Sequence, residues 1–237
     1  MRFQYNYIQV LYSYSMSRKM MRHIEPDSLS PAEMPPIGLP RPKLRGTVPI
    51  EACLQLRRST RQFGSGLLSL AEVTQLLWAA QGVTGLGGLR TAPSAGAIYA
   101  IRLYLLACRV RGLPVGLYKY DADDHYIRFL KSGDLRPGLI ETGLDRAAGN
   151  AAGIIILTAD FRRPLREHGA HAHRLVYIEA GHIGQNICLE STALGLGAIG
   201  LGALDTAAAQ SVLGIKAGED LIYMVAIGKK LGEVAVV

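Results

Sequence analysis

The side chains that could do chemistry begin with three arginines and a serine within five residues. The run Arg57-Arg58-Ser59-Thr60-Arg61 follows a segment that we predict to be a helix. Guanidinium groups make forked hydrogen bonds that fit a phosphate group, and the serine hydroxyl can add another. The spacing predicts a loop that wraps one phosphate. The alternative is a solvated helix end, where basic residues are favoured in any case.

A second candidate is the run of small residues Pro93-Ser94-Ala95-Gly96. Small side chains let a flat ring approach the main chain. Backbone N–H groups and the Ser94 hydroxyl could then bond the polar edge of that ring. The alternative is an ordinary turn before a strand.

Gly195-Leu196-Gly197-Ala198-Ile199-Gly200 matches the GxGxxG pattern in letters. A dinucleotide fingerprint needs these glycines after a strand and before a helix. Here they follow a predicted helix and open a predicted strand, so we reject a Rossmann site. We expect them to end the helix and to leave the strand edge bare for a ligand.

Two glycines also interrupt a predicted helix, at Gly181 and Gly184. Each costs about 1 kcal/mol of helix stability relative to alanine, which suggests that another helix approaches closely. We interpret this stretch as core packing or a dimer seam, in which Gln185 and Asn186 need hydrogen-bond partners.

The histidines and cysteines predict no metal site. His168 and His171 could share a helix face, but His173 could not join them, and no HExxH pattern occurs. Three well-separated cysteines without a CxxC pair favour neither a disulfide framework nor zinc. They read as small buried apolar residues in a reducing cytoplasm: Cys53, Cys108 and Cys188.

Composition indicates a globular protein, with 49% hydrophobic and 19% charged residues among 237. Of the formal net charge of +7, residues 1–46 carry +4. No basic stripe is interleaved with aromatic residues, so we expect no nucleic-acid partner. The positive excess suits a phosphorylated cofactor. No run of about 20 apolar residues exists, so we expect no membrane partner.

The elements that must position these residues mix helices and strands without regular βαβ alternation, which predicts an α+β fold. Residues 1–46, rich in proline, form a predicted arm or linker before one domain at 47–237. Ser69 and Glu72 form a predicted capping box, and Gly82 ends that helix in the left-handed conformation. Predicted helices cover 47–58, 70–81, 171–194 and 205–213. Predicted strands cover 101–110, 116–120, 126–130, 151–159, 198–204 and 221–227.

Six stretches in this order resemble the nitroreductase superfamily, and more closely its SagB-type dehydrogenase branch, which includes azoline oxidases. The resemblance covers roughly residues 40–230. It is carried by RRSTRQF (57–63), LLWAAQGVT (76–84), RTAPSAGAIYAIRLYL (90–105), GLYKYD (116–121), EAGHIGQN (179–186) and LGLGAIGLGALD (194–205).

This resemblance implies an α+β nitroreductase-like fold: a central antiparallel sheet flanked by helices in an intertwined homodimer, with FMN at the interface. It implies hydride transfer through flavin N5 with NAD(P)H as donor, and a small-molecule or peptide substrate. The cofactor-binding positions would be Arg57, Arg58, Ser59 and Arg61 at the phosphate, Pro93, Ser94, Ala95 and Gly96 under the ring, Ile199, Gly200 and Gly202 on the partner side, and Lys229 or Lys230 late in the chain.

One departure from the branch concerns a Lys-Tyr pair that its azoline oxidases carry before the EAGH helix. The matching positions here are Glu167 and His168. We expect His168 to be the candidate catalytic base, since an unperturbed imidazole titrates near neutrality. The leading function is therefore an FMN-dependent oxidoreductase. The alternatives are an azoline dehydrogenase that acts on a modified peptide, a flavin-binding protein without turnover, and a structural protein without flavin.

Overall fold

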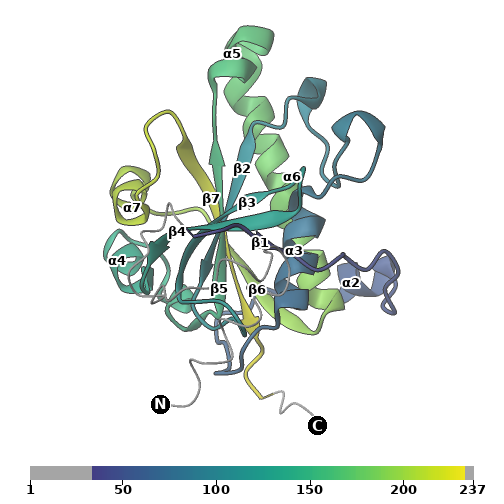
Figure 1. Ribbon diagram of the computed structural model, residues 1–237, viewed down its shortest axis with the longest axis vertical. Coiled ribbons are helices and arrows are strands. Elements are labelled where there is room, and N and C mark those ends of the chain that lie inside the picture. Colours follow the sequence, from purple (N-terminus) through teal and green to yellow (C-terminus); the bar gives the residue numbers. More distant parts are fainter. Residues whose placement is uncertain (1–33, 233–237) are drawn as a thin grey trace, which may run out of the picture.

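The computed structural model describes residues 34–232, which form a seven-stranded sheet with helices on both faces (Figure 1). All the strand pairs are antiparallel, in the order β1-β4-β3-β2-β5-β7-β6. The predicted α+β class and antiparallel sheet are confirmed. The strands are β1 (Ile37–Gly38), β2 (Ile101–Ala107), β3 (Gly116–Asp121), β4 (Tyr126–Ser132), β5 (Gly153–Ala159), β6 (Leu196–Leu201) and β7 (Asp220–Lys229).

Six α-helices surround this sheet within the described residues. They are α2 (Ile50–Leu56), α3 (Leu70–Gln81), α4 (Arg136–Glu141), α5 (Arg162–His168), α6 (Ala172–Ala193) and α7 (Thr206–Leu213). Short 3-10 turns lie at Leu86–Gly88, Ala95–Ala97, Arg146–Asn150 and Gly169–His171. The long helix and the hairpin β3–β4 agree with the sequence prediction. The prediction missed α4, α5 and β1, which are short elements.

Strand β5 is the centre of the molecule, and every one of its residues is buried. Alternate side chains of a strand point to opposite faces, so Ile155 and Leu157 join the core beneath α3 and α6. Ile154 and Ile156 join a second core, beneath α4 and α7. The apolar run at 151–159 therefore marks a strand covered on both faces, as predicted.

Helix α3 begins at the predicted capping box. The Glu72 amide donates to Ser69 Oγ (3.2 Å), and the Ser69 amide donates to Glu72 Oε2 (2.7 Å). The predicted left-handed end at Gly82 is wrong, because this residue has φ −60° and ψ 144°. The Trp78 indole explains the glycine instead. A Cβ at Gly82 would lie 2.1 Å from Trp78 Cδ1.

The start of the structured chain also differs from the prediction. Helix α2 begins at Ile50 after Pro49, without a side-chain cap, so the predicted start near Thr47 is wrong. Within the predicted arm, Ile37 and Gly38 pair with Ile127 and Tyr126 of β4. The rest of that arm, residues 1–33, lies outside the described residues. Between residues 34 and 232, none of the helices combines the length and apolarity needed to cross a bilayer.

Candidate functional site

A cavity of about 420 Å³ lies between α6, β6, β7 and the segment that follows α2. Its size falls in the range of small-molecule and cofactor sites. It is lined by Arg57, Ser59, Tyr177, Ala180, Gly181, Gly184, Gln185, Cys188, Gly200, Ile222 and Tyr223.

The predicted phosphate-binding segment reaches this cavity because it is fixed beside strand β6. Ser59 forms a parallel bridge with Ala198, and the Thr60 amide donates to the Ala198 carbonyl (2.9 Å). Gly197 permits this contact, since a Cβ there would lie 2.6 Å from Thr60 Cγ2. Arg57 and Ser59 thus line the cavity from one side.

The other basic residues of the predicted set lie differently. Arg58 Nη1 donates to the carbonyls of Gln55 (2.9 Å) and Arg57 (2.8 Å), so this guanidinium turns back onto the end of α2. Arg61 is exposed and does not line the cavity. Lys229 Nζ forms an ion pair with Glu72 Oε1 (2.5 Å). Burial raises the pKa of Glu72, but Lys229 and Ser69 together hold it below its ordinary value.

One face of α6 forms the floor of the cavity. Tyr177, Gly181, Gly184 and Cys188 recur every three or four residues and therefore share a face. The predicted approach of another helix to Gly184 is wrong among the described residues. The Tyr223 ring fills that space, and a Cβ at Gly184 would lie 2.7 Å from its Cε1. Gly181 stays open, because a Cβ added there would meet nothing within 4 Å.

Tyr223 also explains Gly200 of strand β6. A Cβ at Gly200 would lie 1.7 Å from Tyr223 Oη, so this strand edge is covered by a tyrosine and not bare as predicted. Ile199 belongs to the opposite core. A Cβ added at Gly202 would lie 3.5 Å from Tyr223 Cδ2, in ordinary contact with the ring. No sequence motif pointed to Tyr223. The paired glycines showed only that something approaches closely.

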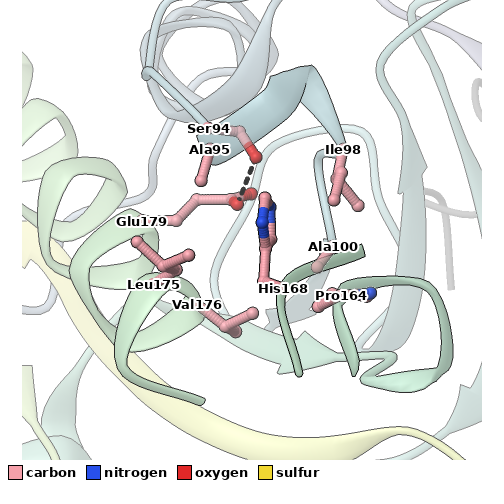
Figure 2. Close-up of a pocket in the computed structure, with 9 residues that line it drawn as sticks. All are labelled: Ser94, Ala95, Ile98, Ala100, Pro164, His168, Leu175, Val176 and Glu179. Atoms are coloured by element: carbon pink, nitrogen blue, oxygen red, sulfur yellow. Dashed lines mark hydrogen bonds between the residues drawn. The ribbon is translucent and has the colours of Figure 1, made fainter. Parts of the chain in front are cut away.

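A second, much smaller cavity of about 10 Å³ lies between α5, α6 and the predicted ring-binding loop (Figure 2). Ser94 Oγ donates to Glu179 Oε2 (2.6 Å) and accepts from the Tyr99 amide (2.9 Å). Ser94 and Ala95 line this small cavity, whereas Pro93 and Gly96 are exposed. The loop and the phosphate-binding segment therefore border different cavities within one chain.

His168 borders the small cavity and not the large one. Its imidazole lies beside the loop, because a Cβ at Gly96 would be 3.6 Å from His168 Cε1 and Nε2. Nε2 is buried without a hydrogen-bond partner, an arrangement that is rare for a buried polar atom. Glu167 is exposed and pairs with Arg166 (3.1 Å).

Glu179 is the buried carboxyl of the small cavity, with 4% of its surface exposed. Oε1 accepts from the Ile101 amide at 3.4 Å, in addition to the Ser94 bond. Burial raises the pKa of Glu179, and its hydrogen bonds and the charge of Arg90 only partly offset that rise. A carboxyl in this position favours its neutral form more than one in water does.

The comparisons with known proteins agree with this architecture. Residues 54–229 match the profile of the Nitroreductase family. The chain belongs to the nitroreductase family. Members of this family are oxidoreductases, and the matched segment contains both cavities.

The nitroreductase relatives cover most of the chain. A protein of Methanocaldococcus jannaschii named as a nitroreductase is 34% identical over 185 residues, which are 78% of this chain and 92% of the relative. The crystal structure of a protein from Ralstonia eutropha JMP134, described as a nitroreductase, is 30% identical with a TM-score of 0.73. It covers 82% of this chain and 89% of its own.

A more distant likeness concerns the fold alone. A chain of the Escherichia coli microcin synthetase McbBCD complex, solved with truncated pro-MccB17 bound, is 17% identical with a TM-score of 0.61. The match covers 90% of this chain and 84% of that one.

The cysteines of this nitroreductase-family chain do not all behave as predicted. Cys53 and Cys108 are buried, and burial raises the pKa of the Cys108 thiol to about 12. Cys188 packs against the apolar core but is only partly buried and lines the large cavity, so the prediction of a fully buried residue holds for Cys53 and Cys108 and not for Cys188. Within residues 34–232, no three His, Cys, Asp or Glu side chains gather as a metal site would need.

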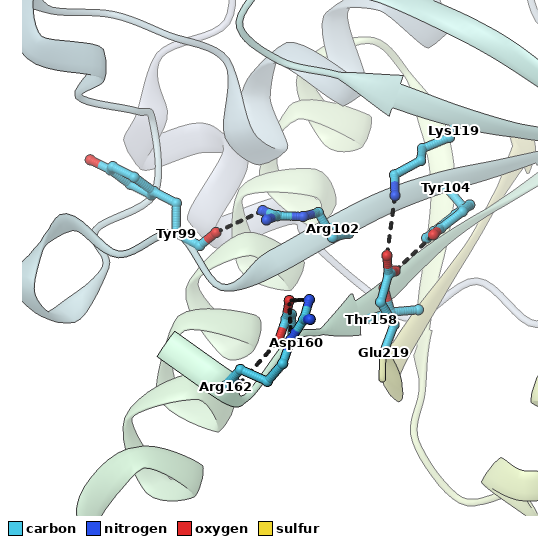
Figure 3. Close-up of polar contacts among 8 residues, drawn as sticks. All are labelled: Tyr99, Arg102, Tyr104, Lys119, Thr158, Asp160, Arg162 and Glu219. Atoms are coloured by element: carbon cyan, nitrogen blue, oxygen red, sulfur yellow. Dashed lines mark hydrogen bonds and ion pairs between the residues drawn. The ribbon is translucent and has the colours of Figure 1, made fainter. Parts of the chain in front are cut away.

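A separate polar cluster lies away from both cavities, around Glu219 before β7 (Figure 3). Its carboxylate accepts from Tyr104 Oη and Thr158 Oγ1, both at 2.7 Å, and from Lys119 Nζ at 3.1 Å. Burial raises the pKa of Glu219, but these three donors together bring it below its ordinary value. Each donor comes from a different strand, so the cluster ties β2, β3 and β5 to the start of β7.

Proposed function

We propose that this protein is an FMN-dependent oxidoreductase with NAD(P)H as its electron donor. The observation that carries the proposal is that Arg57 and Ser59 line the same cavity as Gly181 of α6, where an added Cβ would meet nothing within 4 Å. A guanidinium and a hydroxyl suit a phosphate, and exposed main chain suits a planar ring. The donor set and the open main chain at Gly181 therefore fit FMN.

The protein residues bind and orient the cofactor in this proposal. Arg57 and Ser59 hold its phosphate, while Tyr223 and Gly184 close the cavity beneath it. When bound, the flavin supplies hydride transfer through N5, and the protein needs no side-chain nucleophile. Arg61 and Lys229 do not line the cavity. Arg61 is nevertheless part of the phosphate-binding segment in sequence, and Lys229 lies near the end of that segment in the fold. Gly64, three residues after Arg61, has its amide bonded to the Lys229 carbonyl (2.9 Å).

We also propose that the protein is a homodimer. Within one chain, Arg57 and Gly200 border the large cavity and Ser94 borders the small one, although the resemblance places Gly200, and not the loop of Ser94, on the partner side. A partner copy resolves this difference, because its own loop at 93–96 can approach the flavin. Exposed apolar residues occur on α6, which lines the large cavity, and on α2, which precedes Arg57; they include Leu54, Leu56, Tyr177 and Ile178. Light scattering after gel filtration should give twice the monomer mass of 25.6 kDa.

One absorption experiment tests the proposed activity. The purified protein should show the two visible bands of an oxidised flavin and lose them when NADPH is added without oxygen. A quinone or nitroaromatic compound should then restore the bands. A colourless protein that FMN does not colour would overturn the proposal. Bands that NAD(P)H cannot bleach would indicate flavin binding without turnover.

An azoline dehydrogenase acting on a modified peptide is the second candidate. The shared fold with a chain of the microcin synthetase complex favours it. We retain His168 as its candidate base, since Nε2 is buried without a partner. Oxidation of an azoline-containing peptide that is lost in His168→Ala would support this candidate. Full turnover in His168→Ala would exclude His168 as the base.

We also propose that the protein is located in the cytoplasm. Its three cysteines are free thiols, which suit a reducing compartment.

A further inference from the structure

The loop between Ser94 and Tyr99 has an unusual main-chain conformation. Gly96 has φ 61°, and two residues with side chains, Ala97 and Tyr99, have φ 50° and φ 51°. Positive φ is uncommon outside glycine. Such backbone persists only where the surrounding structure holds it in place. The contacts around this loop should therefore include the groups that hold it.

The Glu179 carboxylate contacts both ends of the loop. At the first end, Oε2 accepts from Ser94 Oγ, which itself accepts from the Tyr99 amide. At the second end, Oε1 accepts from the Ile101 amide. Figure 2 shows the carboxylate reaching from α6 to Ser94, with the His168 ring standing beside it. One side chain thus spans the loop from its start to the strand that follows it.

The position of Glu179 links the loop to the large cavity. It lies on α6 next to Ala180, and Ala180 and Gly184 line the large cavity on the adjoining face of the same helix. The far side of the loop is also fixed, since Tyr99 Oη accepts from the Arg90 amide (3.2 Å) and the Arg90 guanidinium lies over the Tyr99 ring. The loop therefore has a defined placement relative to the helix.

We propose that Glu179 is a positioning residue that, through Ser94, holds the loop at 94–99 in its strained conformation on α6. The inference rests on the proposed function, in which this loop presents its main chain to a flavin ring in its own subunit or in the partner. Glu179 does not touch the cofactor. It acts by keeping Ser94, Tyr99 and Ile101 where the flavin site needs them.

Amide hydrogen exchange of the flavin-free protein tests the holding role directly. Glu179→Ala should raise exchange at Tyr99 and Ile101 by about tenfold, the effect of losing one hydrogen bond to a charged group. Ser94→Ala should raise it at Tyr99 and leave Ile101 nearly unchanged. Glu190→Gln is the matched control, because Glu190 is a partly buried carboxyl of the same helix that bonds Gln75 and not the loop. It should change neither amide.

Flavin binding tests the consequence. Glu179→Ala should weaken FMN binding by about tenfold and shift the visible bands of the bound flavin. Glu179→Gln should recover part of both, because its amide oxygen can still accept one hydrogen bond. Unchanged exchange at Tyr99 and Ile101 in Glu179→Ala and at Tyr99 in Ser94→Ala would overturn the proposal. Should Glu179→Ala not fold, the Ser94→Ala result decides.

The two arms separate the possible failures. If the wild-type protein binds no FMN, the proposed function fails, while the exchange arm still decides whether Glu179 holds the loop. If FMN binds and Glu179→Ala alters exchange without altering affinity or the visible bands, the loop is held by Glu179 but does not serve the flavin site, and the proposal is overturned.

Discussion

Two carboxyl groups, the buried Glu179 and the partly buried Glu219, have opposite surroundings in this molecule. Glu219 accepts hydrogen bonds from three side chains, one of them a lysine, and its pKa is lowered although burial opposes this. Glu179 has no ion pair in the described structure, and burial raises its pKa. The first ties strands together, while the second holds a strained loop beside a cavity. We therefore expect loss of the Glu219 carboxylate to lower stability, and loss of the Glu179 carboxylate to alter the loop beside the small cavity.

The largest expected effect is the loss of protein stability when Glu219 is replaced. Glu219→Ala should lower the free energy of unfolding by about 2–3 kcal/mol, because it leaves the buried Thr158 and Tyr104 hydroxyls without an acceptor. Urea unfolding measures this change. Affinity for FMN should stay the same, since the cluster borders neither cavity. Weaker FMN binding with intact folding would break the distinction between the two regions.

The next effect is on affinity at the cavity side. Arg57→Ala should weaken FMN binding by about 2 kcal/mol, or about 30-fold, because a charge-assisted contact to the phosphate is lost. Stability should change by less than about 0.5 kcal/mol. Fluorescence titration of the flavin measures the affinity. Arg128→Ala is the matched control, since Arg128 is an exposed arginine of β4, far from β6 in the strand order. An equal loss of FMN affinity in both variants would show that the overall positive charge of the protein, and not a specific site at Arg57, attracts the cofactor.

A smaller effect comes from one hydroxyl of the Glu219 cluster. Tyr104→Phe should cost about 1 kcal/mol of unfolding free energy, the value of one hydrogen bond, because Thr158 and Lys119 still contact the carboxylate. Thermal and urea unfolding should agree on the loss. A double variant with Glu219→Ala should lose little more than Glu219→Ala alone, since both changes remove the same contact. Fully additive losses would show that the Tyr104 hydroxyl acts elsewhere.

The smallest effect is a difference in pH dependence. The lowered pKa of Glu219 gives stability that is present above its ordinary pKa of 4.5 and is lost as the pH falls through the lowered value. The raised pKa of Glu179 gives stability that is present below 4.5 and is lost as the pH rises through the raised value. Unfolding free energies should show that Glu219→Gln removes the acid loss and that Glu179→Gln removes the loss on the alkaline side. If both variants changed the pH dependence of the unfolding free energy in the same direction, the two carboxyl groups would not have opposite pKa shifts.

The sequence predicted the features that depend on residues close together in the chain. Ser69 and Glu72 are three residues apart and cap α3 as expected. The apolar run of β5 revealed a strand buried on both faces. The glycines at 195–200 were correctly separated from a dinucleotide site, because they follow a helix and open β6. The rest of the site depended on contacts between distant parts of the chain.

Those distant contacts explain what the sequence could not predict. Tyr223 fills the space beside Gly184 and Gly200 from another strand, so the glycines indicated a close neighbour without naming it. The bond from Ser94 to Glu179 joins residues 85 positions apart. Lys229 meets Glu72 across 157 positions. Helix α5 is only seven residues long, too short for a clear periodic pattern.

A crystal structure of the protein crystallised with FMN would show where the cofactor binds. We expect one flavin per chain, with its phosphate against Arg57 and Ser59 and its ring over Gly181 of α6. Density for the phosphate at any other place, or a cavity that stays empty in the presence of excess FMN, would contradict this expectation.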